Sequence, residues 1–194
     1  LITDARVGAH TCDITMSDGT STTLETYTLT IVQENDAPTL TASAVTSTFT
    51  EGGSNLVLYS SAAAADGDAI PTQTYMTLVV TITNVADTTE YLVIDGSDCA
   101  LGTAATCVAN TATNAGAAVV TVDGSTSTVT WTADAGGISE AAMETLINAI
   151  AYKNIDDSPT VSDDRVITIT TLEDNGGDSG DNDDDVTVSI AATV

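Results

Sequence analysis

Apolar and polar residues alternate with a period of two along much of this chain, and this pattern limits the folds that it can adopt. The segments 10–16 (HTCDITM) and 26–32 (TYTLTIV) are clear examples, and Ser17-Asp18-Gly19 lies between them as a turn. Side chains in a β-strand point to alternate faces, so these segments predict strands with one buried face. The many Val, Ile and Thr residues favour the same structure, because β-branched side chains fit a pleated surface.

The rest of the chain predicts further strands and one short helix. The segment 139–150 (SEAAMETLINAI) has a Ser-Glu start and apolar residues at helical spacing, which predicts a short helix packed across the end of a sandwich. Trp131 lies in an alternating segment and is expected in the core. The predicted fold class is therefore all-β, a Greek-key β-sandwich with one short helix. The other expected strands are 39–50, 75–84, 91–94, 117–122, 127–131 (with 117–122 and 127–131 as a hairpin around Asp123-Gly124), 166–172 and 186–194.

The charge of the chain is strongly unbalanced. It has 28 acidic and three basic residues among 194, which gives a formal net charge of −25. Such self-repulsion costs stability, and bound divalent cations are the simplest compensation, with high external salt as the alternative. The same charge argues against nucleic acid and against an anionic membrane surface as partners. Membrane insertion is not expected either, because the sequence contains no long apolar run.

A repeated order of motifs suggests how the chain is divided into repeat units. Near its start, a strand leads to Asp18-Gly19, a second strand and then Glu34-Asn35-Asp36-Ala37-Pro38; near its end, strand 166–172 leads to Asp174-Asn175-Gly176-Gly177 and strand 186–194. We therefore interpret residues 1–36 as the last strands of one repeat and residues 37–194 as one complete repeat. Two strands alone cannot bury a core, so 1–36 is expected to dock on, or be exchanged with, another unit.

These motifs, in this order, resemble the cadherin-like tandem repeats of large bacterial and archaeal extracellular surface proteins. In that resemblance Glu34-Asn35-Asp36-Ala37-Pro38 is the linker between repeats, and Glu51-Gly52-Gly53 carries the first-strand acidic residue. Asp66-Gly67-Asp68 matches the Asp-x-Asp motif, and Asp18-Gly19 and Asp174 match the late Asp before the final strand. The resemblance implies a cadherin- or immunoglobulin-like sandwich, calcium binding and an extracellular, cell-surface location.

Carboxylate and amide oxygens are the ligands that Ca²⁺ prefers. We therefore expect a calcium cage between two modules. The alternative interpretation is that these residues form turns, because Asp and Asn side chains cap backbone groups. The acidic segments Asp174–Asp185, Asp156-Asp157 and Asp163-Asp164 are either loose calcium sites or solvated loops. The expected ligands are Asp18, Asn35, Asp36, Glu51, Asp66, Asp68 and Asp174.

Three cysteines are present. Cys99 and Cys107 bracket a Gly/Ala/Thr loop and could close a local disulfide, which would fit an oxidising exterior. Cys12 is left over. It is interpreted either as a buried free thiol or as one half of an intermolecular bridge.

No catalytic motif is recognised, so an enzyme is not expected: His10 is the single histidine, and the sequence has no nucleophile elbow, P-loop or dinucleotide fingerprint. Two structural functions remain. The chain is either a subunit of a calcium-stabilised extracellular filament, joined head to tail to copies of itself by strand addition, or a spacer segment of a giant adhesin. A module that binds glycans or proteins is a third class, although few aromatic residues are available for it.

Overall fold

The computed structural model describes residues 8–32, 35–68, 73–109, 116–177 and 184–194. Within these residues the fold is mainly β, with one helix, α1 (Glu140–Asn148). The strands are β1 (Gly8–Ser17), β2 (Thr22–Ile31), β3 (Thr39–Ala44), β4 (Leu56–Val57), β5 (Tyr59–Ala65), β6 (Tyr75–Thr83), β7 (Glu90–Ile94), β8 (Ser97–Ala100), β9 (Ala105–Ala109), β10 (Gly116–Asp123), β11 (Thr126–Ala133), β12 (Ala151–Asn154), β13 (Val166–Asp174) and β14 (Asp185–Thr193).

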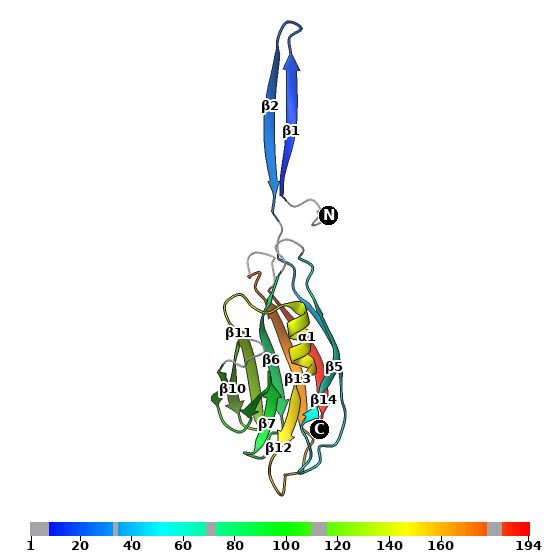
Figure 1. Cartoon of the computed structure of the whole chain (residues 1–194), viewed down its shortest axis with the longest axis vertical. Coiled ribbons are helices and arrows are strands. Elements are labelled where there is room, and N and C mark those ends of the chain that lie inside the picture. Colours follow the sequence, from blue (N-terminus) through cyan, green and yellow to red (C-terminus); the bar gives the residue numbers. More distant parts are fainter. Residues whose placement is uncertain (1–7, 33–34, 69–72, 110–115, 178–183) are drawn as a thin grey trace.

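The body of the molecule is a β-sandwich. A six-stranded antiparallel sheet in the order β14-β13-β6-β11-β10-β9 forms one layer, and the sheets β4-β12-β7-β8 and β3-β5 form the rest (Figure 1). One hydrophobic core joins side chains from all of these sheets and from α1. The all-β sandwich with one short helix that the sequence predicts is therefore confirmed.

The period-two alternation sets the inner face of the large sheet. In β6 from Leu78 onward, and throughout β11, every second side chain is buried, and β11 places Val129 and Trp131 in the core with no exposed surface. The core position of Trp131 is thus confirmed. The predicted hairpin around Asp123-Gly124 joins β10 to β11, and Gly124 adopts a positive φ of 61° there.

Helix α1 lies beside β5, and not across the end of the sandwich as the sequence suggests. Its N-cap is Ser139, whose side chain accepts a hydrogen bond from the Ala142 N–H. Asn148 Oδ1 accepts from the Ala62 N–H at 3.0 Å, and Glu144 Oε1 accepts from the Ala64 N–H at 3.2 Å. The helix therefore satisfies backbone donors of β5 that would otherwise remain open at a sheet edge.

A disulfide links two sheets at one side of the sandwich. Cys99 on β8 and Cys107 on β9 form it, with their Cα atoms 4.9 Å apart. Strand β8 ends the four-stranded sheet and β9 ends the six-stranded sheet. The bridge therefore crosses between the layers of the sandwich.

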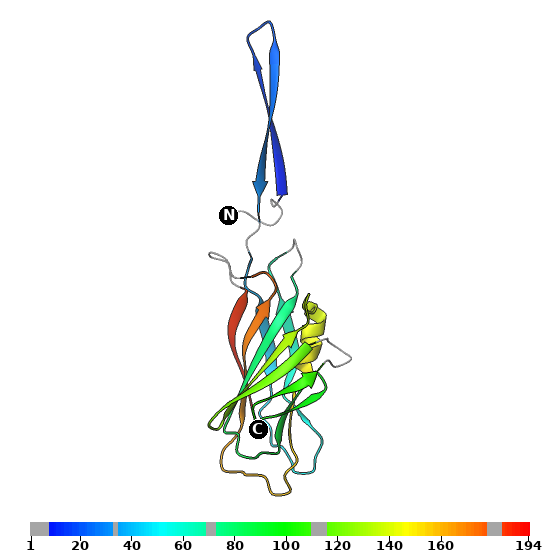
Figure 2. The same ribbon diagram turned by 90° about the vertical axis from the view of Figure 1, so that its left-hand side faces the viewer.

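Strands β1 and β2 form a separate two-stranded hairpin that extends away from the sandwich (Figures 1 and 2). Its pairing places Cys12 opposite Tyr27 and Ile14 opposite Glu25, so the even-numbered residues of β1 share one face. This face is largely apolar but exposed: Met16 is 62% exposed and Tyr27 is 59% exposed. Cys12 is a free, exposed thiol, so its interpretation as a buried thiol is wrong for this structure, because none of the other described elements covers the hairpin face.

Candidate metal site at the linker end of the sandwich

Three segments that are far apart in the sequence meet at the end of the sandwich next to the hairpin. They are residues 35–38, residues 66–68 with 73–74, and residues 174–177; we call this place the linker end. Strand β3 starts here and pairs with the end of β5 through Thr39 and Ala65, which brings residues 35–36 next to residues 66–68. Strand β13 ends here, where Asp174 pairs with Tyr75 at the start of β6.

Asn35 connects the linker to the end of β13. Its Nδ2 donates to Asp174 Oδ1 at 3.4 Å, and its Oδ1 accepts from Gln73 Nε2 at 3.1 Å. The Asn35 amide lies directly against Gly176, where a Cβ atom would collide with it. A glycine is therefore needed at position 176 for the amide to take this place.

Asp36 connects the linker to residues 66–68. Its backbone N–H donates to Asp68 Oδ2 at 3.1 Å, and a Cβ on Gly67 would lie 2.8 Å from Asp36 Oδ2. Gln73 Nε2 also reaches Asp68 Oδ2, at 3.5 Å. The Asp68 side chain is buried, whereas Asp36 is exposed, so the group extends from the interior to the surface.

Two carboxylate oxygens in this group have no hydrogen-bond partner among the described residues. Asp66 Oδ1 accepts from the Asp68 N–H at 2.7 Å and Asp174 Oδ1 accepts from the Gly176 N–H at 2.6 Å, but the Oδ2 atom of each is buried and unpartnered. Asp174 is only 1% exposed. A buried carboxylate oxygen without a partner carries a substantial desolvation cost, so this arrangement is unstable unless a proton or a cation compensates.

The pKa values at the linker end also indicate that the buried carboxylates need a proton or a cation. Burial raises the pKa of Asp174 to about 7, and the neighbouring Asp66 carboxyl group adds to this shift through its charge and by accepting a hydrogen bond from Asp174 when Asp174 is protonated. Burial also raises the pKa of Tyr75, and the charges of Glu140, Asp66 and Asp174 add to that effect. The hydroxyl of Tyr75 is itself buried without a hydrogen-bond partner in the described chain.

The described basic side chains do not neutralise this group. Lys153 pairs with Asp98 and lies 5.2 Å from the centre of the Tyr91 ring, and Arg165 pairs with Glu90 and Asp87 at the other end of the sandwich. The remaining basic residue, Arg6, lies outside the described residues. Compensation by a protein cation is therefore not seen in the part of the chain that the structure describes.

Asp18 does not join the other expected ligands. Its Oδ1 accepts from the N–H groups of Thr20 and Ser21, each at 2.8 Å, in the turn of the hairpin. These backbone donors hold the pKa of Asp18 below its usual value. Strand β2 separates this turn from Asn35 and is about 30 Å long at ~3.3 Å per residue, so Asp18 cannot reach the linker end.

Glu51 also lies elsewhere. It is exposed in the loop between β3 and β4, and the neighbouring Gly53 N–H donates to Thr50 O at 2.9 Å. Because β3 starts at the linker end and runs away from it, this loop lies at the opposite end, which we call the base. The structure thus brings together five of the seven expected ligands: Asn35, Asp36, Asp66, Asp68 and Asp174.

Sequence reasoning missed two further oxygen donors at the linker end, Gln73 and Asn175. Asn175 Oδ1 accepts from the Thr74 N–H at 2.9 Å. Gln73 belongs to no acidic motif, so only its place in three dimensions could reveal it. Asn175 lies in the acidic segment 174–185 but was not among the expected ligands. Glu34 and residues 178–183 of the acidic segment 174–185 lie outside the described residues.

The chemistry of the donors can be compared with that of different metal ions. All are carboxylate or amide oxygens, which suit Ca²⁺ or Mg²⁺ and not the softer metals that prefer sulfur and imidazole. Among the described residues, no three Asp, Glu, His or Cys side chains are already arranged to hold a metal ion. The donor types and the two unpartnered oxygens therefore fit calcium, whereas the ligand shell is not assembled within the described chain.

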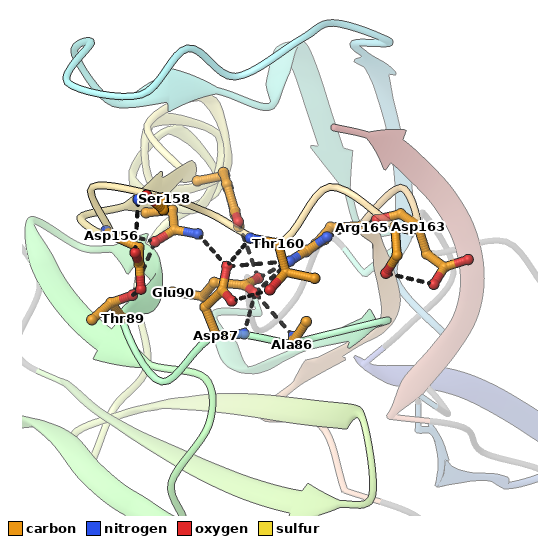
Figure 3. Close-up of polar contacts among 12 residues, drawn as sticks. Ala86, Asp87, Thr89, Glu90, Asp156, Ser158, Thr160, Asp163 and Arg165 are labelled. Carbon is orange, nitrogen blue, oxygen red and sulfur yellow. Dashed lines mark hydrogen bonds and ion pairs between the residues drawn. The ribbon is translucent and has the colours of Figure 1, made fainter.

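The base of the sandwich carries a second polar cluster that the sequence did not predict (Figure 3). Glu90 is fully buried and accepts from Arg165 through both oxygens, at 3.1 Å from Nε and 2.8 Å from Nη2. The Tyr152 hydroxyl donates to Glu90 Oε2 at 3.0 Å, and the backbone N–H groups of Ala86 and Asp87 donate to Oε1. Each oxygen of this buried carboxylate is therefore fully paired.

Asp87 extends this cluster to the loop that precedes β13. Its oxygens accept from the Thr160 N–H at 2.9 Å, the Thr160 hydroxyl at 2.6 Å and Asn154 Nδ2 at 2.9 Å. Burial would raise the pKa of Asp87, but hydrogen bonds from Thr160 and Asn154 and the Arg165 charge hold it below the usual value. The cluster thus fastens the loop 155–165 to the sheet.

A half-open cavity of about 360 Å³ lies beside this cluster, lined by Phe49, Tyr152, Thr160 and Arg165 among others. The Nε, Nη1 and Nη2 atoms of Arg165 all donate within the protein, to Glu90 and to Asp163 O. The guanidinium is therefore already engaged, and the cavity is lined by hydroxyl groups, two aromatic rings and the acidic residues Asp163 and Asp164.

Comparisons with known proteins give no family for this chain. No protein-family model, no curated protein and no solved structure matches it. Within the described residues, the helix is too short to cross a membrane.

Proposed function

We propose that this chain is a calcium-stabilised structural module of an extracellular filament or surface assembly in which modules follow one another head to tail. The observation that carries the proposal is the linker end, where two buried carboxylate oxygens lack a partner and no described basic side chain compensates them. Calcium supplies the missing positive charge and takes six to eight oxygen ligands in flexible geometry.

The residues of the linker end divide into two roles in this proposal. Asp66, Asp68 and Asp174 provide carboxylate oxygens from the sandwich, and Asn35 and Asp36 provide oxygens from the linker. Bound calcium would therefore connect the linker to the body of the module and restrict the angle between this module and the hairpin that precedes it.

The disulfide supports the extracellular part of the proposal. Cys99 and Cys107 join the edges of two sheets, and such bridges persist in oxidising compartments and are rare in the cytosol. Extracellular fluids also supply calcium at the millimolar concentrations that weak sites need. A net charge of −25 is compatible with a module that is saturated with divalent cations.

The two ends of the sandwich support the head-to-tail order in this proposal. The linker end carries the five expected ligands, and the base carries Glu51 in an exposed loop. When modules stack in one direction, the base of one module faces the linker end of the next. Glu51 is then available to a neighbouring site, which is consistent with a ligand shell that the described residues do not complete.

A second candidate is a spacer segment of a longer adhesin, and the hairpin favours it. Strands β1 and β2 repeat the order of strand, Asp turn and strand that β13 and β14 show at the end of the sandwich. In this reading the same calcium-bound linker stiffens an array of modules whose adhesive site lies elsewhere.

Isothermal titration of the full chain with CaCl₂ tests the metal site. We expect saturable binding in the wild-type chain and at least ~10-fold weaker binding in Asp68→Asn and Asp174→Asn, because each loses a charged ligand. Asp123→Asn, in the exposed β10–β11 turn, is the matched control and should bind as the wild type does. Equal affinity in all four proteins would refute the site.

Negative-stain imaging tests the assembly. Filaments that straighten in millimolar calcium and disperse in excess chelator would support the filament reading. Single particles in both conditions, with calcium binding retained, would favour the hypothesis that the chain is a spacer segment of a longer adhesin.

A further inference from the structure

The apolar face of the hairpin matches a buried strip of the sandwich, position by position. Counting back from the turn aspartates Asp18 and Asp174, Met16 corresponds to Leu172. The register of β13 shifts by one residue between Ile169 and Thr171, and past that irregularity Ile14 corresponds to Ile169. In the same count Cys12 corresponds to Ile167.

The two strips have opposite environments. Ile167, Ile169 and Leu172 are completely buried, whereas Ile14 is 48% exposed and Met16 is 62% exposed. Strand β13 is covered because it pairs with β6 on one side and β14 on the other and lies against the core. The hairpin has strand pairing between β1 and β2 only, so it lacks the neighbour that β6 provides.

The residues two positions before the two apolar strips also correspond to each other. Arg165 precedes Ile167 by two residues, and His10 precedes Cys12 by two residues. In the sandwich this position faces the buried carboxylate of Glu90. An imidazole N–H at the equivalent place would be able to donate a hydrogen bond to the same carboxylate in a related sandwich.

An intact second copy has no vacant place for the hairpin. Its own β13 and β14 already occupy the position beside β6, and residues 45–47 cover the end of β14 through hydrogen bonds between Val45, Ser47 and Thr193. A contact between two hairpins is also unfavourable. Each face is about 33 Å by 10 Å, so two faces bury only ~700 Å², less than the ~1,000 Å² of a stable interface.

We propose that the hairpin Gly8–Ile31 supplies the last two strands of a second β-sandwich, whose other strands correspond to residues 37–164 of this chain and which has no β13 and β14 of its own. Strand β1 then pairs with the equivalent of β6, and Cys12, Ile14 and Met16 enter its core. This inference extends the proposed head-to-tail function by naming the partner, and it does not depend on calcium.

A fusion protein that carries residues 37–164 ahead of the full chain provides the test. Cys12 is the free thiol of the described chain, so its alkylation rate reports whether the hairpin face is covered. We expect rapid labelling in the unfused chain and labelling about 100-fold slower in the fusion, because a thiol in a core reacts only after opening. Labelling at the same rate in both proteins would overturn the proposal.

Two fusion variants identify the face that is used. Ile14→Asp puts a charge on the apolar face and should restore rapid labelling. Thr15→Asp puts the same charge on the opposite face and should leave Cys12 protected. If both variants behave alike, or if the unfused chain already forms a dimer in which Cys12 is protected, the partner is not an open sandwich and the proposal fails.

The labelling is carried out in excess chelator and repeated in calcium, with melting followed through Trp131 in the unfused chain. Loss of the calcium effect on melting would contradict the proposed metal site without changing the labelling result. Unprotected Cys12 in a fusion that still responds to calcium would contradict only the hairpin assignment.

Discussion

The two ends of the sandwich differ in how their buried carboxylates are paired. At the base, Glu90 is fully buried and is paired by Arg165, Tyr152 and two backbone N–H groups. At the linker end, Asp174 is almost as deeply buried, but one of its oxygens has no partner among the described residues. Burial is thus similar at both ends, whereas the supply of positive charge differs.

This difference suggests that the stability of one end is independent of the solution conditions, whereas the stability of the other end depends on them. The base contains its own cation, so its stability should not depend on the surrounding solution. The linker end lacks a described cation, so its stability should depend on protons or on bound metal. The predictions below test this contrast, starting with the largest expected effect.

Removal of the cation at the base should have the largest effect. Arg165→Met leaves the buried Glu90 carboxylate uncompensated, which typically costs about 3–5 kcal/mol. Chemical denaturation should show this loss equally in calcium and in chelator. A loss below 1 kcal/mol would mean that the pair is not the structural anchor of the base.

A change at Gly176 should affect only the linker end. In Gly176→Ala the new Cβ displaces the Asn35 amide and breaks its contact with Asp174, so we expect a loss of about 1 kcal/mol and weaker calcium binding. Gly102→Ala is the control, because a Cβ there makes ordinary contacts with Thr88. Similar calcium affinities in the two variants would contradict the role of Asn35.

The pKa of Asp174 predicts a pH dependence with a definite sign. Its folded value of about 7 lies above the usual value for an aspartate, so between about pH 4 and 7 the folded state binds more protons than the unfolded state. In chelator, this group should therefore lower the stability as the pH rises through that window. Asp174→Asn should remove this component, and calcium should offset it in the wild type. Denaturation curves from pH 4 to 8 that are identical for the wild type and the variant would exclude this titration.

The exposed ion pair should have the smallest effect. Lys153 and Asp98 form a salt bridge with side chains 25% and 45% exposed. Lys153→Met should change the stability by less than about 1 kcal/mol, measured by the same denaturation as Arg165→Met. An effect as large as that of Arg165→Met would show that burial does not separate the two pairs.

Local sequence patterns were sufficient for much of the fold. The alternation around Trp131 indicated the buried face of β11, and the Ser139 cap with apolar residues at helical spacing indicated α1. The same alternation in β1 and β2 predicted one buried face, and this is wrong, because both strands are exposed along nearly their whole length. Strands β4, β5, β8, β9 and β12 were not predicted, because they are short or rich in Ala, Thr and Ser. The position of α1 depends on the backbone donors of β5, which no local pattern reveals.

The candidate site was predictable only where a motif and a sheet register coincide. Asn35, Asp36, Asp66, Asp68 and Asp174 come together because β3, β5 and β13 each have one end at the linker. Asp18 and Glu51 carry equally suitable carboxylates but are separated from them by the length of a strand. The pair Glu90 and Arg165 was missed because 75 positions separate the two residues and neither belongs to a recognisable motif.

The most direct test of calcium as the missing cation is the melting temperature of the full chain in calcium and in chelator, with sodium chloride at matched ionic strength as the control for screening. At 100 times the dissociation constant, bound calcium adds about 2.7 kcal/mol, which corresponds to a rise of roughly 5–10 °C for a domain of this size. We predict this rise in the wild type and its absence in the Asp66→Asn/Asp174→Asn double variant. Equal melting temperatures in calcium and in sodium chloride, or a rise that persists in the double variant, would contradict the account.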